Sequence, residues 1–237
     1  MFRLFNTPQW FNGIDIVFDT IMLVIALLIA GYSMYAYKKS GENRFSYFAL
    51  AFSLISFSFL FKILMQNLVY FATVRNIASS VLIPVVGKAA SGINYSQLFF
   101  RAGFFLSMSS MLGAWLLIFF ISQRKSGRLK NYHDVSQIAL FIYLIVLISV
   151  VSNFRFTVFY LTSSVILGMT VLNYYKNYLN TKNKNTLVVM SAFILLCFAN
   201  IFFVFVFISQ SFYVVGEVFM LIGFLSLLYM YRKIKRN

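Results

Sequence analysis

The stretch from residue 45 to residue 71, FSYFALAFSLISFSFLFKILMQNLVYF, constrains the fold of this chain more than any other. It is predominantly apolar throughout, and as an α-helix of this length it would extend roughly 40 Å at about 1.5 Å per residue. Because the hydrocarbon core of a bilayer is about 30 Å thick, the stretch predicts a membrane-spanning helix. Lys62, Gln66 and Asn67 lie near one end, where lipid tolerates polar side chains poorly. A spanning helix with a buried cation needs polar partners elsewhere in the chain.

The composition excludes a soluble globular fold. Hydrophobic residues make up 61% of the 237 positions and charged residues 11%, and the mean hydropathy is +0.85. A soluble domain carries about 25% charged residues, because water must wet its surface. The apolar runs are continuous rather than alternating, which favours helices over a transmembrane barrel. We therefore predict an all-α membrane protein.

Seven apolar runs predict one seven-helix transmembrane domain over residues 1–237. The expected spans are about 14–37, 45–71, 98–122, 135–151, 156–175, 186–208 and 213–231. The segment 73–97 contains Pro84, Gly87 and Gly92 and is too interrupted to span. It predicts a loop with a short amphipathic or re-entrant piece.

Basic residues predict the orientation of these helices. Fourteen Lys and Arg fall on the side of the first connector and of the C-terminus, against five on the other side. The positive-inside rule then places the N-terminus outside and the C-terminus in the cytoplasm of a cell-membrane protein. Cytoplasmic basic connectors would contact anionic lipid headgroups. Because these charges lie in short connectors between spans, they do not indicate nucleic-acid binding.

An ungapped shift of 141 residues indicates an internal repeat. It sets Ala51 on Ala192, Phe52 on Phe193 and Phe61 on Phe202, so that spans one and two fall on spans five and six. The corresponding architecture is a parallel 3+1+3 arrangement with the fourth helix as linker, a symmetry found among transporters. Phe-rich helices also align by chance, so both explanations stay open.

Charged residues of four spans lie at one depth. Asp19, Arg101 and Glu217 are each a few residues from the outer end of a span, and Lys62 reaches the same level from the opposite direction. Asp15 lies one turn above Asp19 on the same helix face. We predict an outward-facing ligand pocket formed by Asp19, Lys62, Gln66, Arg101, Asn200, Tyr213 and Glu217. The alternative is that these residues only pair with one another and hold the helices in register.

Enzymatic and metal-binding signatures are not found in the sequence. It contains no HExxH, no GxSxG and no glycine-rich phosphate loop, and it has one cysteine, Cys197, and one histidine, His133. The last span has no lysine that could carry retinal. We therefore expect no catalytic residues, no cofactor and no metal site.

The segment from Tyr35 to Lys62, YAYKKSGENRFSYFALAFSLISFSFLFK, resembles the first hairpin of archaeal and bacterial seven-helix proteins of unknown function. It is also similar to the seven-helix sensor regions that precede some histidine kinases. This resemblance implies a seven-helix fold and a sensor role. The topology is similar to that of 3+1+3 sugar transporters as well, but the proline-containing motifs of that family are absent here.

These observations lead to three functional hypotheses. The first is a non-enzymatic sensor or receptor-like protein that signals to a separate partner through its basic cytoplasmic face. The second is a small-solute or ion transporter of the 3+1+3 type, which needs a path that opens to both sides in turn. The third is a membrane assembly subunit without a ligand. Few polar residues lie in the inner halves of the spans, which favours the first hypothesis over the second.

Overall fold

The computed structural model describes residues 7–71, 95–123 and 156–236, and every regular element among them is a helix. Six are long α-helices that are apolar enough to cross a membrane. Because a helix satisfies its backbone hydrogen bonds internally, continuous apolar runs adopt this structure in lipid. The elements are η1 (Gln9–Phe11), α1 (Ile14–Ser40), α2 (Asn43–Tyr70), α4 (Tyr95–Gln123), α6 (Phe156–Thr181), α7 (Lys184–Val204), η3 (Phe205–Phe207) and α8 (Ser211–Arg236).

These helices coincide with six of the seven predicted spans. Several continue past the apolar run into polar residues: α6 ends at Thr181 rather than near Tyr175, and α8 ends at Arg236 rather than near Tyr231. Hydropathy marks where lipid ends, whereas helical hydrogen bonding continues into the interface. The sixth helix is shorter than predicted, since α7 ends at Val204 and a 3-10 turn follows. The predicted fourth span (135–151) and nearly all of the predicted loop (73–97) lie outside the described residues.

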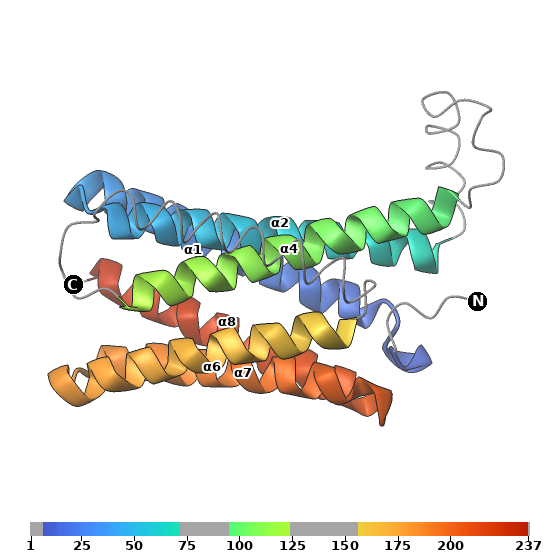
Figure 1. The fold of residues 1–237 in the computed structure, drawn as a ribbon. Coiled ribbons are helices and arrows are strands. Elements are labelled where there is room, and N and C mark those ends of the chain that lie inside the picture. The colour runs from blue at the N-terminus through green and yellow to red at the C-terminus, as the bar shows by residue number, and fades with distance from the viewer. Residues whose placement is uncertain (1–6, 72–94, 124–155, 237) are drawn as a thin grey trace, which may run out of the picture.

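The six helices form two layers of three (Figure 1). In the first half, α2 packs between α1 and α4; in the second half, α7 packs between α6 and α8. The halves meet where α4 contacts α6 and where α1 contacts α8. The helix α4 ends at one end of the bundle and α6 begins at the opposite end (Figure 1).

The two described turns at the end of the bundle opposite the start of α1 have the same geometry. In each half a helix ends in a residue of left-handed conformation, Gly41 with φ 69° and Lys182 with φ 47°. One extended residue follows in each case, Glu42 or Asn183, and the next helix begins. Both pairs of positions differ by 141, the offset that the sequence comparison indicates. Residues other than glycine rarely adopt a positive φ. Lys182 therefore repeats an uncommon backbone conformation at the position that corresponds to Gly41.

An aromatic layer joins the halves near the middle of the bundle. The ring of Phe224 on α8 lies 5.6 Å from that of Phe59 on α2 and 6.4 Å from that of Trp115 on α4, centroid to centroid. All three side chains are fully buried. Rings at these distances attract one another beyond their buried area.

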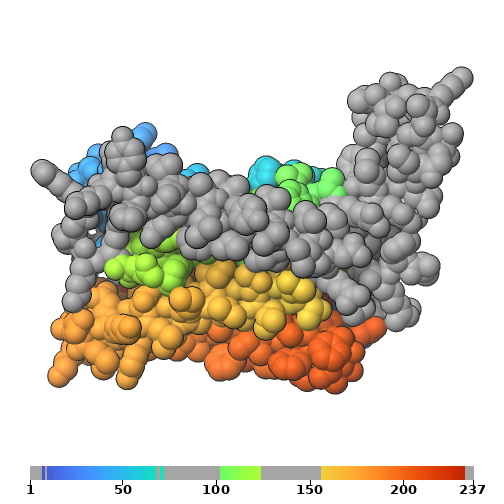
Figure 2. Space-filling model, viewed as in Figure 1, coloured from blue at the N-terminus to red at the C-terminus, as the bar shows by residue number. Residues whose placement is uncertain are grey.

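Exposed apolar side chains line the outside of the bundle. The helix α6 lies at the surface in the view of Figure 2, and large exposed apolar residues recur along it: Leu161, Val165, Met169, Leu172 and Leu179. Such a continuous apolar face is a liability in water and is suited to lipid. The composition and these helices together support a multi-pass membrane protein.

Two glycines of α8, Gly216 and Gly223, allow α7 to approach closely. The contacts of Gly223 give a first prediction. A Cβ on Gly223 would lie 2.9 Å from the side chain of Leu196 and 3.3 Å from the carbonyl oxygen of Ala192. We expect Gly223→Ala to lower the free energy of unfolding by about 1–2 kcal/mol, because overpacking forces neighbours apart. Thermal unfolding in detergent measures it. Gly31→Ala is the control, since a Cβ there meets nothing within 4 Å, and an equal loss in both variants would contradict the packing explanation.

Candidate functional site

Lys62 lies in the interior of the bundle and binds carboxyl groups from both halves. Its Nζ donates to Oδ1 of Asp19 on α1 at 2.8 Å and to Oε1 of Glu217 on α8 at 2.7 Å. Asp19 and Glu217 are completely buried, and Lys62 is 7% exposed. The ammonium also lies 5.7 Å from the centroid of the Tyr213 ring, within the range of a cation–π interaction. Lys62 therefore links α1, α2 and α8.

A second set of hydrogen bonds extends this network toward the start of α1. Nε2 of Gln66 donates to Oδ2 of Asp19 at 2.8 Å and to Oδ2 of Asp15 at 3.2 Å. The hydroxyl of Tyr70 donates to the same Asp15 oxygen at 2.6 Å. We call Asp15, Asp19, Lys62, Gln66, Tyr70 and Glu217 the charge cluster.

Local structure explains why Asp15 is held so firmly. Its Oδ1 accepts hydrogen bonds from the backbone N–H groups of Gly13 and Ile16, both at 2.9 Å. These groups belong to the first turn of α1, whose free N–H groups and dipole favour a negative charge. Gly13 has a φ of 92° and begins the helix. Just before it, Phe11 is buried and its ring lies 6.3 Å from that of Tyr213, so the lead-in residues cover this end of the bundle.

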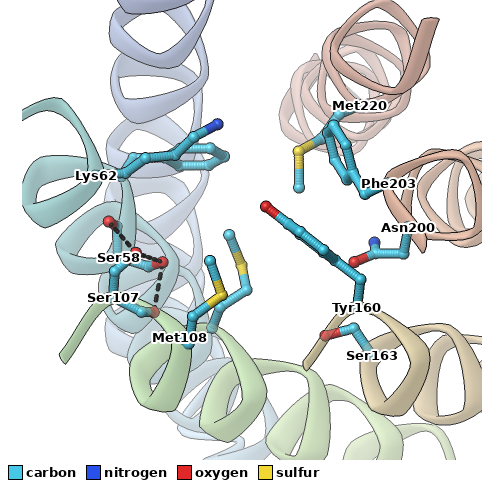
Figure 3. Close-up of a pocket in the computed structure, with 11 residues that line it drawn as sticks. Ser58, Lys62, Ser107, Met108, Tyr160, Ser163, Asn200, Phe203 and Met220 are labelled. Carbon is cyan, nitrogen blue, oxygen red and sulfur yellow. Dashed lines mark hydrogen bonds between the residues drawn. The ribbon is translucent and has the colours of Figure 1, made fainter. Parts of the chain in front are cut away.

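A small cavity, lined by both polar and apolar side chains, lies next to the charge cluster, between the two halves. Its volume is about 20 Å³, enough for one water molecule. Figure 3 shows Lys62 on one side and the Tyr160 hydroxyl pointing toward the centre from the other. The residues that line it are Ser58, Phe59, Lys62, Ser107, Met108, Met111, Tyr160, Ser163, Asn200, Phe203 and Met220.

Serine pairing fixes one wall of this cavity. Oγ of Ser58 donates to the carbonyl oxygen of Ser107 at 2.7 Å, and Oγ of Ser107 donates to the carbonyl oxygen of Ser58 at 3.0 Å (Figure 3). These reciprocal bonds hold α2 against α4 without a large side chain between them. Small hydroxyl residues allow such close helix contacts in membranes.

The structure separates the predicted pocket residues into two groups. The first group surrounds the Lys62 ammonium and consists of Asp19, Glu217 and Tyr213, with Gln66 bound to Asp19. Asn200 is apart from it: this residue lines the cavity, and its side chain donates to the carbonyl oxygen of Leu196. Arg101 lies in α4, but its side chain is outside the described part of the chain. Thus, of the predicted residues, Lys62 and Asn200 line this cavity. The two predicted acids, Asp19 and Glu217, form ion pairs with Lys62 in the charge cluster.

Sequence reasoning missed Tyr70 and the Ser58–Ser107 pair. Ser58, Lys62 and Gln66 recur at intervals of four residues along α2, and one further step of the same interval reaches Tyr70. This spacing was a usable signal for the phenol. The partner of Ser58 had no such signal, because it depends on how α4 is rotated against α2.

Among the described residues, no group of three or more His, Cys, Asp or Glu side chains is arranged to hold a metal ion. The site consists of one ammonium, carboxyl groups, a phenol and an amide in van der Waals contact with aromatic rings. Such a constellation can exchange protons and can change its ion pairing. Comparison of the chain with protein-family models, with curated proteins and with solved structures finds no match.

Proposed function

We propose that this chain is a non-enzymatic, receptor-like or sensor-like membrane protein that responds through the charge cluster. The proposal is carried by one observation: the Lys62 ammonium joins a carboxyl of the first half to a carboxyl of the second, beside a small cavity. A ligand that competes for Glu217 would weaken a bond between the halves, since Lys62 lies in the first half and Glu217 in the second. Such a two-state contact is what a switching membrane protein requires.

The internal repeat distinguishes a functional charge from a structural one. The offset of 141 sets Asp19 on Tyr160 and Lys62 on Phe203. Asp19 and Lys62 form an ion pair at 2.8 Å, and the rings of Tyr160 and Phe203 lie 4.8 Å apart. The second half thus makes the corresponding helix contact with aromatic rings alone. The first two helices of the second half thus pack without an ion pair at this position, which supports a functional role for the ion pair of the first half.

The proposed arrangement in the membrane follows the basic residues. Lys38, Lys39 and Arg44 lie around the α1–α2 turn, Lys182 and Lys184 around the α6–α7 turn, and Arg232 near the end of α8. These places are at one end of the bundle, opposite the charge cluster (Figure 1). By the positive-inside rule this end faces the cytoplasm of a seven-helix protein in the cell membrane, and the cluster faces outward.

The cytoplasmic basic end is the proposed output surface. It attracts anionic lipid headgroups, at about 1 kcal/mol per nearby charge, and a separate signalling protein of acidic surface would be recognised by the same charges. The resemblance of Tyr35–Lys62 to the seven-helix sensor regions of histidine kinases supports this role. A change at the cluster would reach this end through α1 and α8, both of which extend from one end of the bundle to the other (Figure 1).

Spin-label distances between the halves test the proposal. Cys197 is replaced by Ser, and pairs of cysteines are placed at the exposed residues Phe71 and Ser209 at the cluster end, or Ser40 and Asn183 at the basic end. The perturbation is the triple variant Asp19→Asn, Lys62→Met and Glu217→Gln, which removes the Lys62 ammonium and both carboxyl groups that it contacts. We expect the Phe71–Ser209 distances to lengthen and broaden in nanodiscs while the Ser40–Asn183 distances stay unchanged. Identical distributions at both ends would favour an assembly subunit whose charges only pair.

Transport is the second candidate, because the buried faces of the halves correspond. After subtraction of 141, the buried residues of α7 fall on buried residues of α2: Ala192 on Ala51, Phe193 on Phe52, Leu196 on Ile55, Ala199 on Ser58, Asn200 on Phe59 and Phe203 on Lys62. A 3+1+3 repeat with a cavity between its halves is an arrangement that transporters use. Proteoliposomes containing a trapped pH dye separate the candidates, because proton-coupled transport dissipates an imposed pH gradient whereas a sensor leaves it intact.

A further inference from the structure

The three carboxyl groups of the charge cluster outnumber its cations. Asp15, Asp19 and Glu217 are completely buried, and Lys62 contacts two of them, Asp19 and Glu217. The side chain of Arg101, on α4, lies outside the described residues; even if its guanidinium joined the cluster, one negative charge would remain in excess. Carboxylates that are buried near one another each raise the cost of charging the others. Among the described residues, the site therefore has a place for one more positive charge.

The hydrogen bonds show where that charge belongs. Both oxygens of Asp15 and both oxygens of Asp19 accept hydrogen bonds, and Oε1 of Glu217 accepts from Lys62. Oε2 of Glu217 is buried and has no hydrogen-bond partner among the described residues. The two oxygens share one carbon, so Oε2 necessarily lies beside the cluster. A buried ionised oxygen without a donor is strongly unfavourable, and a neutral hydroxyl there is much less so.

We propose that Oε2 of Glu217 binds a proton, and that this proton is the ligand to which the charge cluster responds. Uptake forms one O–H bond on Oε2, with the proton taken from hydronium, which leaves water. The Lys62–Glu217 contact then changes from an ion pair to a hydrogen bond with a neutral acid, which is weaker. Protonation loosens α8 from α2, and proton release tightens the halves. This inference deepens the proposed sensor role and rests on it.

The groups that face Glu217 are consistent with a proton site. From α1 it faces Asp19, with Asp15 one turn away; from α2 it faces Lys62, with Tyr70 beyond Gln66. Tyr213 on α8 and Tyr160 on α6 complete the titratable groups in the described residues near Lys62. A proton needs no free volume at Oε2, whereas a metal ion would have to displace packed side chains. The adjoining cavity, with room for one water molecule, lies beside Lys62.

Infrared spectroscopy of the full chain in nanodiscs tests this assignment. A protonated carboxyl group gives a C=O stretching band that shifts to lower frequency in D2O. We expect this band in the wild-type protein at neutral pH and its loss in Glu217→Gln, which keeps an oxygen to accept from Lys62. Glu42→Gln is the matched control, because Glu42 is exposed at the opposite end of the bundle, and it should retain the band.

Two results would overturn the proton site. One is a wild-type spectrum without any protonated carboxyl band at neutral pH, which needs no variant to interpret. The other is a band that persists in Glu217→Gln. If the wild-type band is missing and sodium chloride raises the unfolding temperature above that in choline chloride, the missing charge is a sodium ion and the proposal fails.

The spin-label pairs keep this result separate from that of the proposed function. If the proton site and the sensor role are both correct, the Phe71–Ser209 distances lengthen when the wild-type protein is moved from alkaline to neutral pH. A band that is lost in Glu217→Gln together with pH-independent distances upholds the proton site and contradicts the sensor role. A distance change with pH in the absence of a band contradicts the proton site alone.

Discussion

Replacing Lys62 by Met lowers the free energy of unfolding by about 3–5 kcal/mol, the largest loss that we expect from any single substitution. Methionine has about the length of the lysine stem but carries no charge. It leaves Asp19 and Glu217 completely buried without the ammonium that both contact at less than 3 Å. The measurement is thermal unfolding of the purified protein in detergent, followed by circular dichroism and by loss of the folded peak on size exclusion.

Two further variants separate charge from shape. Lys39→Met removes an exposed lysine from α1 and should change stability by less than about 0.5 kcal/mol. The triple variant Asp19→Asn, Lys62→Met and Glu217→Gln removes the ammonium together with both of its carboxyl partners. It should recover most of the stability that Lys62→Met loses, since replacing all members of a buried ion pair is often neutral. If the triple variant were as unstable as Lys62→Met, the loss would come from packing of the lysine stem.

Phe224→Ala gives the second largest effect, a loss of about 2–3 kcal/mol through the cavity that it leaves. Phe224 is completely buried between Phe59 and Trp115, which belong to the other half of the bundle. The loss arises from missing contacts rather than from hydrophobic transfer, because lipid is as apolar as the protein core. Thermal unfolding in detergent again measures it.

Leu225→Ala is the matched control for Phe224→Ala. Leu225 is the next residue of α8 and is 46% exposed on the outside of the bundle, where lipid or detergent fills the space of a removed side chain. We expect its loss to be below about 1 kcal/mol. Comparable losses in the two variants would show that the aromatic layer does not hold the halves together.

Most of the helices could be predicted from the sequence because lipid imposes a simple rule on them. Each run must be apolar over the thickness of the bilayer and must satisfy its own backbone, so α1, α2, α4, α6, α7 and α8 follow from composition along the chain. Their ends were less predictable: α6 continues from Tyr175 to Thr181 because helical hydrogen bonds extend into the polar interface. The fourth span, the orientation and the repeat stay predictions.

The depth of the charge-cluster residues in the membrane could be predicted from the sequence, but the contacts between them could not. Counting residues from the ends of the spans places Lys62 level with Asp19 and Glu217, and in the structure all three are in contact. The same count places Asn200 at this level, yet its side chain lines the cavity together with Tyr160. The ion pairs are formed by residues of α1, α2 and α8. Depth follows from the rise of one helix, whereas contact also depends on the rotation of that helix against its neighbours.

The amino-acid sequence by itself therefore determined which segments enter the membrane and at what level their charges lie, because the transfer of each side chain into lipid is a local property. Only the tertiary structure decided that Lys62 contacts one carboxyl from each half, that Tyr70 and Gln66 hold Asp15, and that Oε2 of Glu217 has no partner among the described residues. Those contacts join α1, α2 and α8, which are far apart along the chain. They depend on how the helices pack together, and packing is a property of all the interfaces at once.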